Sequence, residues 1–236
     1  IQDMERLQKL TPHVLAAVGS DIDASTATAY GVIGALEAYQ NSLKSKTSQE
    51  KIALVHGCGS VGHVVAELLI EMSWKVLTVD IDPVRSQIDG AFSLDSKSEW
   101  WKEAFDVLIP CSISGLLTES IVKSLNIEAV IPAANAPFSH PSNIKTLMEK
   151  NIEVIPDPIV NAGAVIADSI ELFDPDSWNT SNPDDIYQFV KACVFENTST
   201  FLNLRKKGLS VEDTFKKIIE TKPNNPIGLN FSQYKR

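Results

Sequence analysis

The sequence lacks the features that mark membrane, disulfide-rich and nucleic-acid-binding proteins. No apolar run approaches the roughly 18–20 residues of a membrane helix. Three cysteines, Cys58, Cys111 and Cys193, are odd in number and widely spaced, which argues against a disulfide framework or a structural zinc site. The chain has 21 Lys and Arg against 30 Asp and Glu, a net charge of −9, so it lacks the basic excess that phosphate binding needs.

What is present is the composition of an ordinary globular protein. Of 236 residues, 44% are hydrophobic and 22% charged, enough for one large domain or two small ones. Eleven Gly and 12 Pro show no period, which excludes collagen-like and low-complexity chains. The cysteine pattern suits a reducing compartment, the cytoplasm or an organelle matrix. Because the first residue is Ile1 and not Met, we expect the natural start, and any targeting peptide with it, to be missing.

Short apolar runs alternate with helical stretches along most of the chain. Helical segments of roughly ten to fifteen residues are expected between most of the strands. This alternation predicts an α/β fold, a doubly wound parallel sheet with helices on both faces. The expected strands are residues 52–56, 75–79, 92–94, 107–109, 129–131 and 154–155.

The two ends of the chain differ from this middle region. Apolar residues recur every three or four positions over residues 25–42, which predicts a helix, and a polar linker follows at 44–50. Residues 174–184 are rich in Pro, Asp, Ser and Asn and predict a loop. Further helices are expected at 184–207 and 211–221, before an irregular tail at 222–236.

The sharpest local pattern is Gly57-x-Gly59-x-x-Gly62, between a predicted strand and a predicted helix. In a dinucleotide-binding loop the first glycine allows the tight turn, the second lets the backbone approach a pyrophosphate, and the third lets the helix pack against the strand. The pyrophosphate would sit on the helix N-terminus, at Ser60 and Val61, where free N–H groups favour negative charge. The pattern predicts a Rossmann-type dinucleotide-binding domain.

Asp80, at the end of the next predicted strand, strengthens this interpretation. A carboxylate there can accept hydrogen bonds from the adenine-ribose hydroxyls and would repel a 2′-phosphate. Asp82 adds negative charge and Arg85 is the nearby cation, so we expect NAD rather than NADP. Taken alone, Asp80 could equally be a solvated turn residue. Cys58 and His63 lie in the loop region, but we expect them to fill the helix start without a chemical role.

Four further segments carry distinctive motifs: 23–32 (DASTATAYGV), 106–112 (DVLIPCS), 134–137 (ANAP) and 156–165 (PDPIVNAGAV). They resemble segments of the Glu/Leu/Phe/Val amino-acid dehydrogenase family, most closely of its leucine and phenylalanine dehydrogenases. They follow the family's order, and the similarity covers about residues 23–221. The segment 156–165 is the most specific, because the family carries Pro-Asp and then Asn-Ala-Gly-Gly-Val there.

The resemblance implies that several of these residues contact the nicotinamide half of the cofactor. Thr28 would lie near the nicotinamide, and Cys111 and Ser112 would pass its ribose. Asn135 and Asn161 follow predicted strand ends, where ligands bind in open parallel sheets. An Asn amide can both donate to and accept from a carboxamide. The alternative for either Asn is a turn or cap residue.

The resemblance also implies an activity, the NAD-dependent oxidative deamination of an L-amino acid to the 2-oxo acid and ammonia. Family members supply the base and the carboxylate clamp as lysines of an N-terminal substrate domain, one in a Gly-Gly-x-Lys-type stretch that is absent here. We therefore expect a connector at 1–22, a dinucleotide-binding domain at 23–182 and C-terminal helices and tail at 183–236 that pack back on it. Alone, this chain should bind NAD and catalyse nothing.

Other interpretations stay open. The chain could be a non-catalytic, regulatory NAD-binding module, or a different Rossmann-type oxidoreductase with His140 as the acid/base. The partner expected is a small amino acid or 2-oxo acid, with neither nucleic acid nor membrane, and a homo-oligomer is possible.

Two residues depart from the family pattern. Ala164 stands where the family has its second Gly, so the backbone approach there should be tighter. The resemblance implies that Val165 and Asp168 line the substrate side-chain pocket. At the position of Asp168 the family carries an uncharged residue. A carboxylate there would disfavour Leu and Phe, because an unpaired buried charge is costly. The alternative is that Asp168 is an exposed helix residue.

Overall fold

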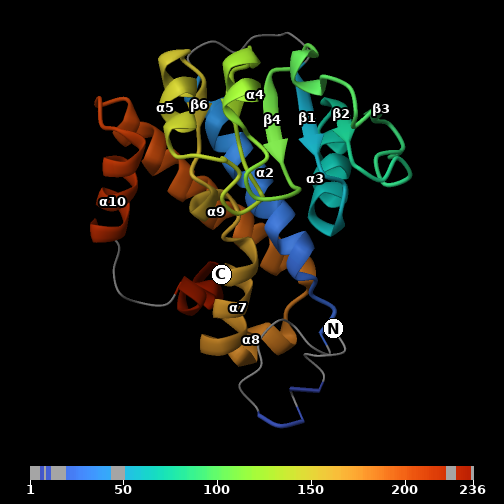
Figure 1. Ribbon diagram of the computed structural model, residues 1–236. Coiled ribbons are helices and arrows are strands. Elements are labelled where there is room, and N and C mark those ends of the chain that lie inside the picture. The colour runs from blue at the N-terminus through green and yellow to red at the C-terminus, as the bar shows by residue number, and fades with distance from the viewer. Residues whose placement is uncertain (1–5, 8, 12–19, 44–50, 222–226, 235–236) are drawn as a thin grey trace.

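The computed structural model describes residues 6–7, 9–11, 20–43, 51–221 and 227–234. Its centre is one six-stranded sheet in which every pair of neighbouring strands is parallel, in the order β3-β2-β1-β4-β5-β6 (Figure 1). The chain leaves the middle of the sheet in opposite directions on either side of the β1–β4 pair, which confirms the doubly wound fold. The strands are β1 (Ile52–His56), β2 (Lys75–Val79), β3 (Phe92–Leu94), β4 (Val107–Pro110), β5 (Ala129–Val130) and β6 (Glu153–Val154).

Helices cover both faces of the sheet, because the strands are apolar on both sides. On β1, Ala53 and Val55 face one hydrophobic cluster and Leu54 faces the other. The first cluster packs α2 (Ala24–Ser42), α3 (Ser60–Glu71) and α9 (Pro183–Arg205) against the sheet. The second lies under the short helix η1 (Trp100–Lys102), α4 (Glu119–Ser124) and α5 (Ser142–Glu149).

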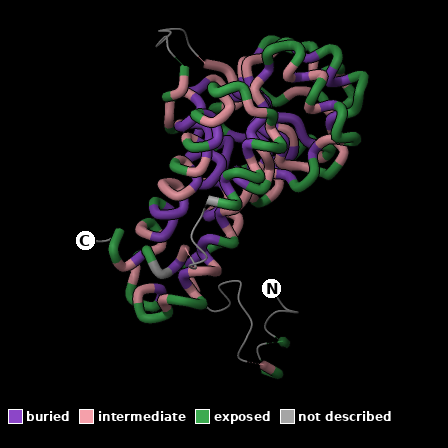
Figure 2. Tube along the Cα trace, turned by 90° about the vertical axis from the view of Figure 1, so that its left-hand side faces the viewer, coloured by how far each residue is buried: buried purple, intermediate pink, exposed green. Residues whose placement is uncertain are grey.

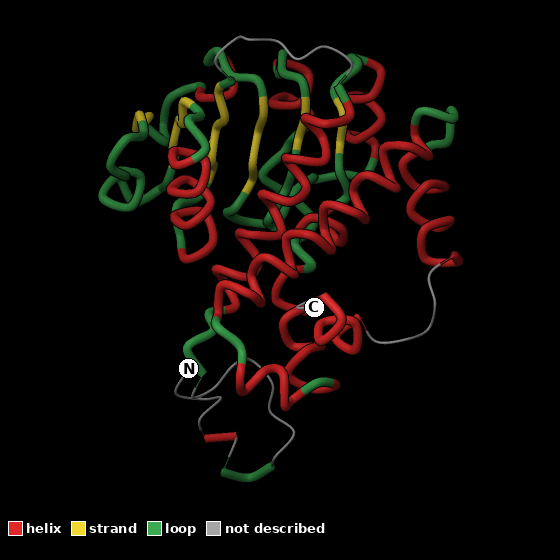
Figure 3. Tube along the Cα trace, turned by 180° about the vertical axis from the view of Figure 1, so that it is seen from behind, coloured by secondary structure: helices red, strands yellow, loops and turns green. Residues whose placement is uncertain are grey.

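The two long helices α2 and α9 lie against each other behind the sheet (Figure 3). Figure 2 shows that the buried residues run from the sheet along these helices toward the end that holds the C-terminus. Two more helices, α6 (Asp157–Val160) and α7 (Gly163–Phe173), follow β6. The carboxyl ends of the strands face the part of the molecule where α7 lies (Figure 1).

Several predictions about the connections were wrong. Within the expected loop 174–184, α8 (Pro175–Thr180) forms, because Asp174 accepts from the Ser177 N–H at 3.4 Å and Trp178 is buried. Asp is a good helix N-cap, and Pro suits the first helical position.

The tail and the crossovers also differ from expectation. In the tail, η2 (Ile227–Asn230) and α11 (Phe231–Tyr234) form around the buried Phe231, which packs on Phe189. The crossover helices α4 and α5 have six and eight residues, shorter than expected, and the described segment between β2 and β3 contains only turns.

The remaining helix predictions were close. The first expected helix is α2, and the helix expected at 184–207 is α9. Gly208, shortly after the end of α9, has a φ of +87°. The last, α10 (Val211–Thr221), matches its predicted bounds. The expected connector at 1–22 and the linker at 44–50 lie largely or wholly outside the described residues. Among the helices that are described, none is both long and apolar enough to span a membrane.

Candidate functional site

The three glycines of the loop after β1 differ in the space around them. Gly57 has a φ of +94° and donates its N–H to the Val79 carbonyl at 2.7 Å, so it makes the turn. A Cβ on Gly62 would lie 1.8 Å from the Gly57 carbonyl oxygen, so the helix can approach the loop only without a side chain there. A Cβ on Gly59 would meet nothing within 4 Å, so the backbone there faces open space. This is the arrangement that a bound pyrophosphate requires.

The start of α3 is open to an anion. Gly59 is its N-cap, and no side chain caps the helix there. The first N–H groups of a helix have no partner within the helix, and Ser60, the first residue of α3, lines a depression in front of the loop. That depression measures about 520 Å³ and is lined by Cys58, Gly59, Ser60, His63, Val84, Arg85 and Gln87.

Asp80 joins the end of β2 to this loop. Its side chain is only 8% exposed, and it accepts hydrogen bonds from the N–H groups of Cys58 at 2.6 Å and Asp82 at 2.8 Å. It is therefore not a solvated turn residue. Each carboxylate oxygen has a second lone pair, so these bonds leave acceptor capacity. The Arg85 side chain is exposed and lies 3.6 Å from the Asp82 carboxylate.

Cys111 and Ser112 follow β4 and lie directly beside the glycine loop. A Cβ on Gly57 would come within 2.6 Å of the Ser112 Cβ. The Ser112 hydroxyl is 2.9 Å from His56 Nδ1. Burial lowers the pKa of His56 to about 4, and its ring lies 4.7 Å from that of Trp100, so it is neutral at pH 7. His56 thus orients Ser112, and apart from the place of His56 before Gly57 nothing in the sequence points to this contact.

The two thiols beside the loop are poor nucleophiles. Burial raises the pKa of Cys58 to about 11 and raises that of Cys111 further. Both therefore stay protonated at neutral pH, and a thiolate is the reactive form of cysteine. None of the three cysteines, all of which lie in the described part of the chain, forms a disulfide. His63, on the first turn of α3, is exposed and lies 3.4 Å from Glu67.

Asn135 and Asn161 come together at the carboxyl end of the sheet. The Asn161 amide donates to Asn135 Oδ1 at 2.8 Å and to the Ala133 carbonyl at 3.3 Å. Ala136, which follows Asn135, has a φ of +44° and donates its N–H to the Asp157 carboxylate at 2.9 Å. The Asn pair is thus held by the loops after β5 and β6. Asp157 was not predicted as a site residue, although it lies within the Pro-Asp pair of the segment 156–165.

Thr28 reaches the same region from α2. A Cβ on Gly163, at the start of α7, would lie 2.7 Å from the Thr28 Cα, so the two helices touch there. The Thr28 hydroxyl donates to the Ala24 carbonyl at 2.9 Å. On α7, Ala164 and Asp168 are half-buried and Val165 is 69% exposed, so Asp168 is not a fully exposed residue.

His140 is exposed at the start of α5. Its Nδ1 lies 2.8 Å from the Ser142 hydroxyl and accepts from the Ser142 N–H at 3.2 Å. These contacts give it a role in starting the helix. Within the described part of the chain, no group of three His, Cys, Asp or Glu side chains is placed to hold a metal ion.

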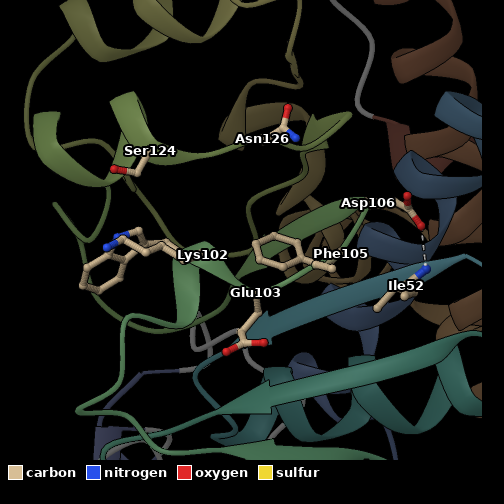
Figure 4. A pocket seen from close by; sticks show the side chains of 9 residues that line it. Ile52, Lys102, Glu103, Phe105, Asp106, Ser124 and Asn126 are labelled. Atoms are coloured by element: carbon tan, nitrogen blue, oxygen red, sulfur yellow. Dashed lines mark hydrogen bonds between the residues drawn. The ribbon is translucent and has the colours of Figure 1, made fainter.

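Another depression lies at the opposite, amino-terminal edge of the sheet (Figure 4). It measures about 340 Å³ and lies where β1 and β4 begin. There the Asp106 carboxylate accepts from the Ile52 N–H at 2.8 Å, and Phe105 lines the wall. Ligands of open parallel sheets bind at the other edge, so this depression is not the candidate site.

Comparison with known proteins places this geometry in a family. Residues 19–83 and 80–210 match the family described as glutamate/leucine/phenylalanine/valine dehydrogenase. A phenylalanine dehydrogenase of Caldalkalibacillus thermarum is 29% identical over 221 residues, which cover 90% of this chain and 58% of that protein. A valine dehydrogenase of Streptomyces albus is 33% identical over 163 residues, which cover 65% of this chain and 45% of that protein.

Solved structures share the fold at lower identity. The L-tryptophan dehydrogenase from Nostoc punctiforme superposes with a TM-score of 0.72 at 19% identity, covering 92% of this chain and 63% of that one. A hetero-hexameric glutamate dehydrogenase from Thermus thermophilus gives 0.69 at 18% identity, covering 95% and 54%. The matched region therefore spans between 45% and 63% of the length of these proteins. It belongs to the glutamate/leucine/phenylalanine/valine dehydrogenase family.

Proposed function

We propose that this chain is the NAD(H)-binding part of an enzyme that oxidatively deaminates an L-amino acid to the 2-oxo acid and ammonia. The observation that carries the proposal is the glycine loop. Gly59 faces open space at an uncapped helix start, while Gly57 and Gly62 have room for no side chain. That cradle fits a pyrophosphate, and the sheet order is that of dinucleotide-binding domains.

The loop residues Gly57, Gly59, Ser60, Val61 and Gly62 would hold the pyrophosphate. Backbone N–H groups do this work, so the role depends on local geometry rather than on side-chain chemistry.

The carboxylate of Asp80 would accept from the adenine ribose and disfavour the 2′-phosphate of NADP. Asp82 adds a second carboxylate nearby, and it also engages the side chain of Arg85, the cation lining the depression. Two acids and one already paired cation favour NAD over NADP.

At the second half of the sheet, Thr28, Cys111, Ser112, Asn135 and Asn161 would surround the nicotinamide and its ribose. The Asn135–Asn161 pair holds two amides at the carboxyl edge, and amides match a carboxamide in both donor and acceptor. When bound, the nicotinamide supplies the hydride acceptor. The chain's own residues bind and orient it.

The base and the carboxylate clamp of the reaction would come from a substrate domain outside this sequence. In this proposal, residues 1–22 connect to that domain, 23–182 form the dinucleotide-binding domain, and 183–236 pack back on it through α9. The long contact between α9 and α2 supports the last assignment.

A fluorescence titration of NADH and NADPH with the chain tests cofactor binding. NADH should bind, and NADPH should bind more weakly. Gly59→Val should abolish binding without lowering the Tm, because its side chain projects into open space where the pyrophosphate would lie. Equal or tighter binding of NADPH would refute the role of Asp80.

An activity assay separates this proposal from its alternatives. The isolated chain should not reduce NAD with any common L-amino acid. Measurable reduction would revive His140 as an acid/base. If the protein from the whole gene binds NADH but deaminates no amino acid, the chain is a non-catalytic NAD-binding module instead.

A further inference from the structure

One face of α7 carries exposed apolar side chains near both ends of the helix. Ile166, Ala167 and Ile170 are buried against the body of the protein. Val165 and Leu172 are exposed, and helical spacing places Asp168 between them on the same face. Asn161 stands one turn before Val165, so this face begins at the Asn pair on the carboxyl edge of the sheet.

Asp168 is the charged group on this apolar face, and the described residues provide no ion-pair partner for it. It is half-buried, and burial together with the nearby Glu171 raises the pKa of its carboxyl. Among the described residues it takes part in no hydrogen bond or ion pair. From residue 151 to residue 190 the sequence contains eight Asp and Glu and no Lys or Arg. The stretch of sequence that carries α7 therefore contributes no cation of its own.

We infer that Asp168 selects amino acids whose side chain carries an N–H donor over purely apolar ones. The inference rests on the proposed function. In a doubly wound sheet the second mononucleotide lies over the half formed by β4, β5 and β6. A substrate that reacts there is beside Asn161, so its side chain can extend along this face of α7. It would then meet the apolar Val165 first and the carboxylate of Asp168 one turn later.

The selectivity follows from what the carboxylate loses or gains. A Leu or Phe side chain would displace water from Asp168 and leave it unpaired, which is costly for a charged group. A Lys or Arg side chain would pair with it, and the indole N–H of Trp would donate to it without adding charge. Lys, Arg and Trp side chains all carry an N–H donor. Comparing Lys and Arg with Trp shows whether the carboxylate prefers a charged or a neutral donor.

The experiment measures kcat/KM of the protein from the whole gene on Leu, Phe, Trp, Lys and Arg. In Asp168→Val the preference for the best N–H-bearing substrate over Leu should fall by about tenfold to hundredfold. Asp168→Asn keeps an acceptor of the same shape but no charge. It should therefore retain a preference for Trp and lose one for Lys or Arg. The matched control is Asp176→Asn, an exposed acid on α8, which should leave the ranking unchanged.

The outcomes separate this inference from the proposed function. If amino acids are deaminated but Asp168→Val leaves their ranking unchanged, or if Leu and Phe are the best substrates of the unaltered protein, the inference is wrong and the function stands. If NADH binds but no amino acid is oxidised, the function fails and the inference with it. NADH affinity, unchanged in all three variants, shows that each variant is folded.

Discussion

The two edges of the sheet use polar groups in different ways. At the amino-terminal edge they pair with one another: Lys51 with Glu128 at 2.8 Å, Arg205 with Glu153 at 3.4 Å. At the carboxyl edge the polar groups are backbone N–H groups, amides and the buried carboxylate of Asp80, with an uncapped helix start facing open space. One edge pairs its charged groups with each other, and the other leaves helix N–H groups and part of its acceptor capacity to a ligand.

The difference has a simple origin. In parallel strands all carboxyl ends meet at one edge, and the helices that follow begin there, so helix N-termini gather at that edge. The amino-terminal edge receives helix C-termini, whose carbonyl groups do not favour an anion. Among the described residues, the second oxygen of Glu128 is the buried side-chain atom at that edge without a hydrogen bond.

The largest effect should come from filling the closest approach at the carboxyl edge. In Gly62→Ala the new Cβ would overlap the Gly57 carbonyl oxygen, and overpacking of this kind should lower the free energy of unfolding by about 3 kcal/mol. Gly59→Ala, three residues earlier, adds the same atom to open space, so it should cost far less stability than Gly62→Ala while weakening the binding of NADH. Urea unfolding and NADH titration of both variants measure this. Equal stabilities would mean that the loop can move away from α3.

A pH effect of similar size should come from His56. Its pKa of about 4 lies below the roughly 6.5 of an unfolded histidine, so the unfolded state binds more protons between those values. Stability is therefore full above pH 6.5 and falls as the pH drops toward 4, by up to about 1.4 kcal/mol per pH unit. Urea unfolding between pH 7 and 5 tests this, above the range where most carboxylates titrate.

His56→Gln should flatten this pH dependence, because the amide can still contact Ser112 but does not titrate. The exposed His63→Gln should leave it unchanged. If both variants keep the slope, another group is responsible, and the carboxyl edge can accept a buried charge after all.

The sequence predicted most of this edge, and the reason is local. Each loop glycine acts through its own backbone, so the spacing of Gly57, Gly59 and Gly62 determines the turn. The pairing of Asn135 with Asn161 was not predictable from the residues alone, because it depends on how the loops after β5 and β6 meet. Helix α8 was missed because its Pro and Asp, typical of a loop, are equally typical of a helix start. Only the burial of Trp178 decides between the two.

A smaller effect is expected at the amino-terminal edge. The Lys51 and Glu128 side chains are 19% and 40% exposed, so solvent screens their ion pair. Glu128→Gln should cost about 0.5–1 kcal/mol of stability and leave NADH affinity unchanged. A double-mutant cycle with Lys51→Met isolates the pair. A change in NADH affinity would contradict the separation of roles between the two edges.

A comparably small effect separates two alanines whose backbone conformations differ. Ala136 has a φ of +44°, a region that costs a residue with a Cβ about 1–2 kcal/mol. Glycine relieves this cost but loses about 0.4–1 kcal/mol through its freer unfolded chain. Ala136→Gly should therefore stabilise the protein by roughly 0.5–1 kcal/mol.

Ala164 is the matched control, because it lies inside the helix α7 with ordinary helical geometry. Ala164→Gly should destabilise the protein by about 0.5–1 kcal/mol, since glycine is a poor helix former. Thermal unfolding of both variants should give shifts of opposite sign. Two shifts of the same sign would show that backbone conformation does not decide where this chain tolerates alanine. The turn that holds Asn135 would then be unstrained, and its positive φ would carry no cost for the carboxyl edge.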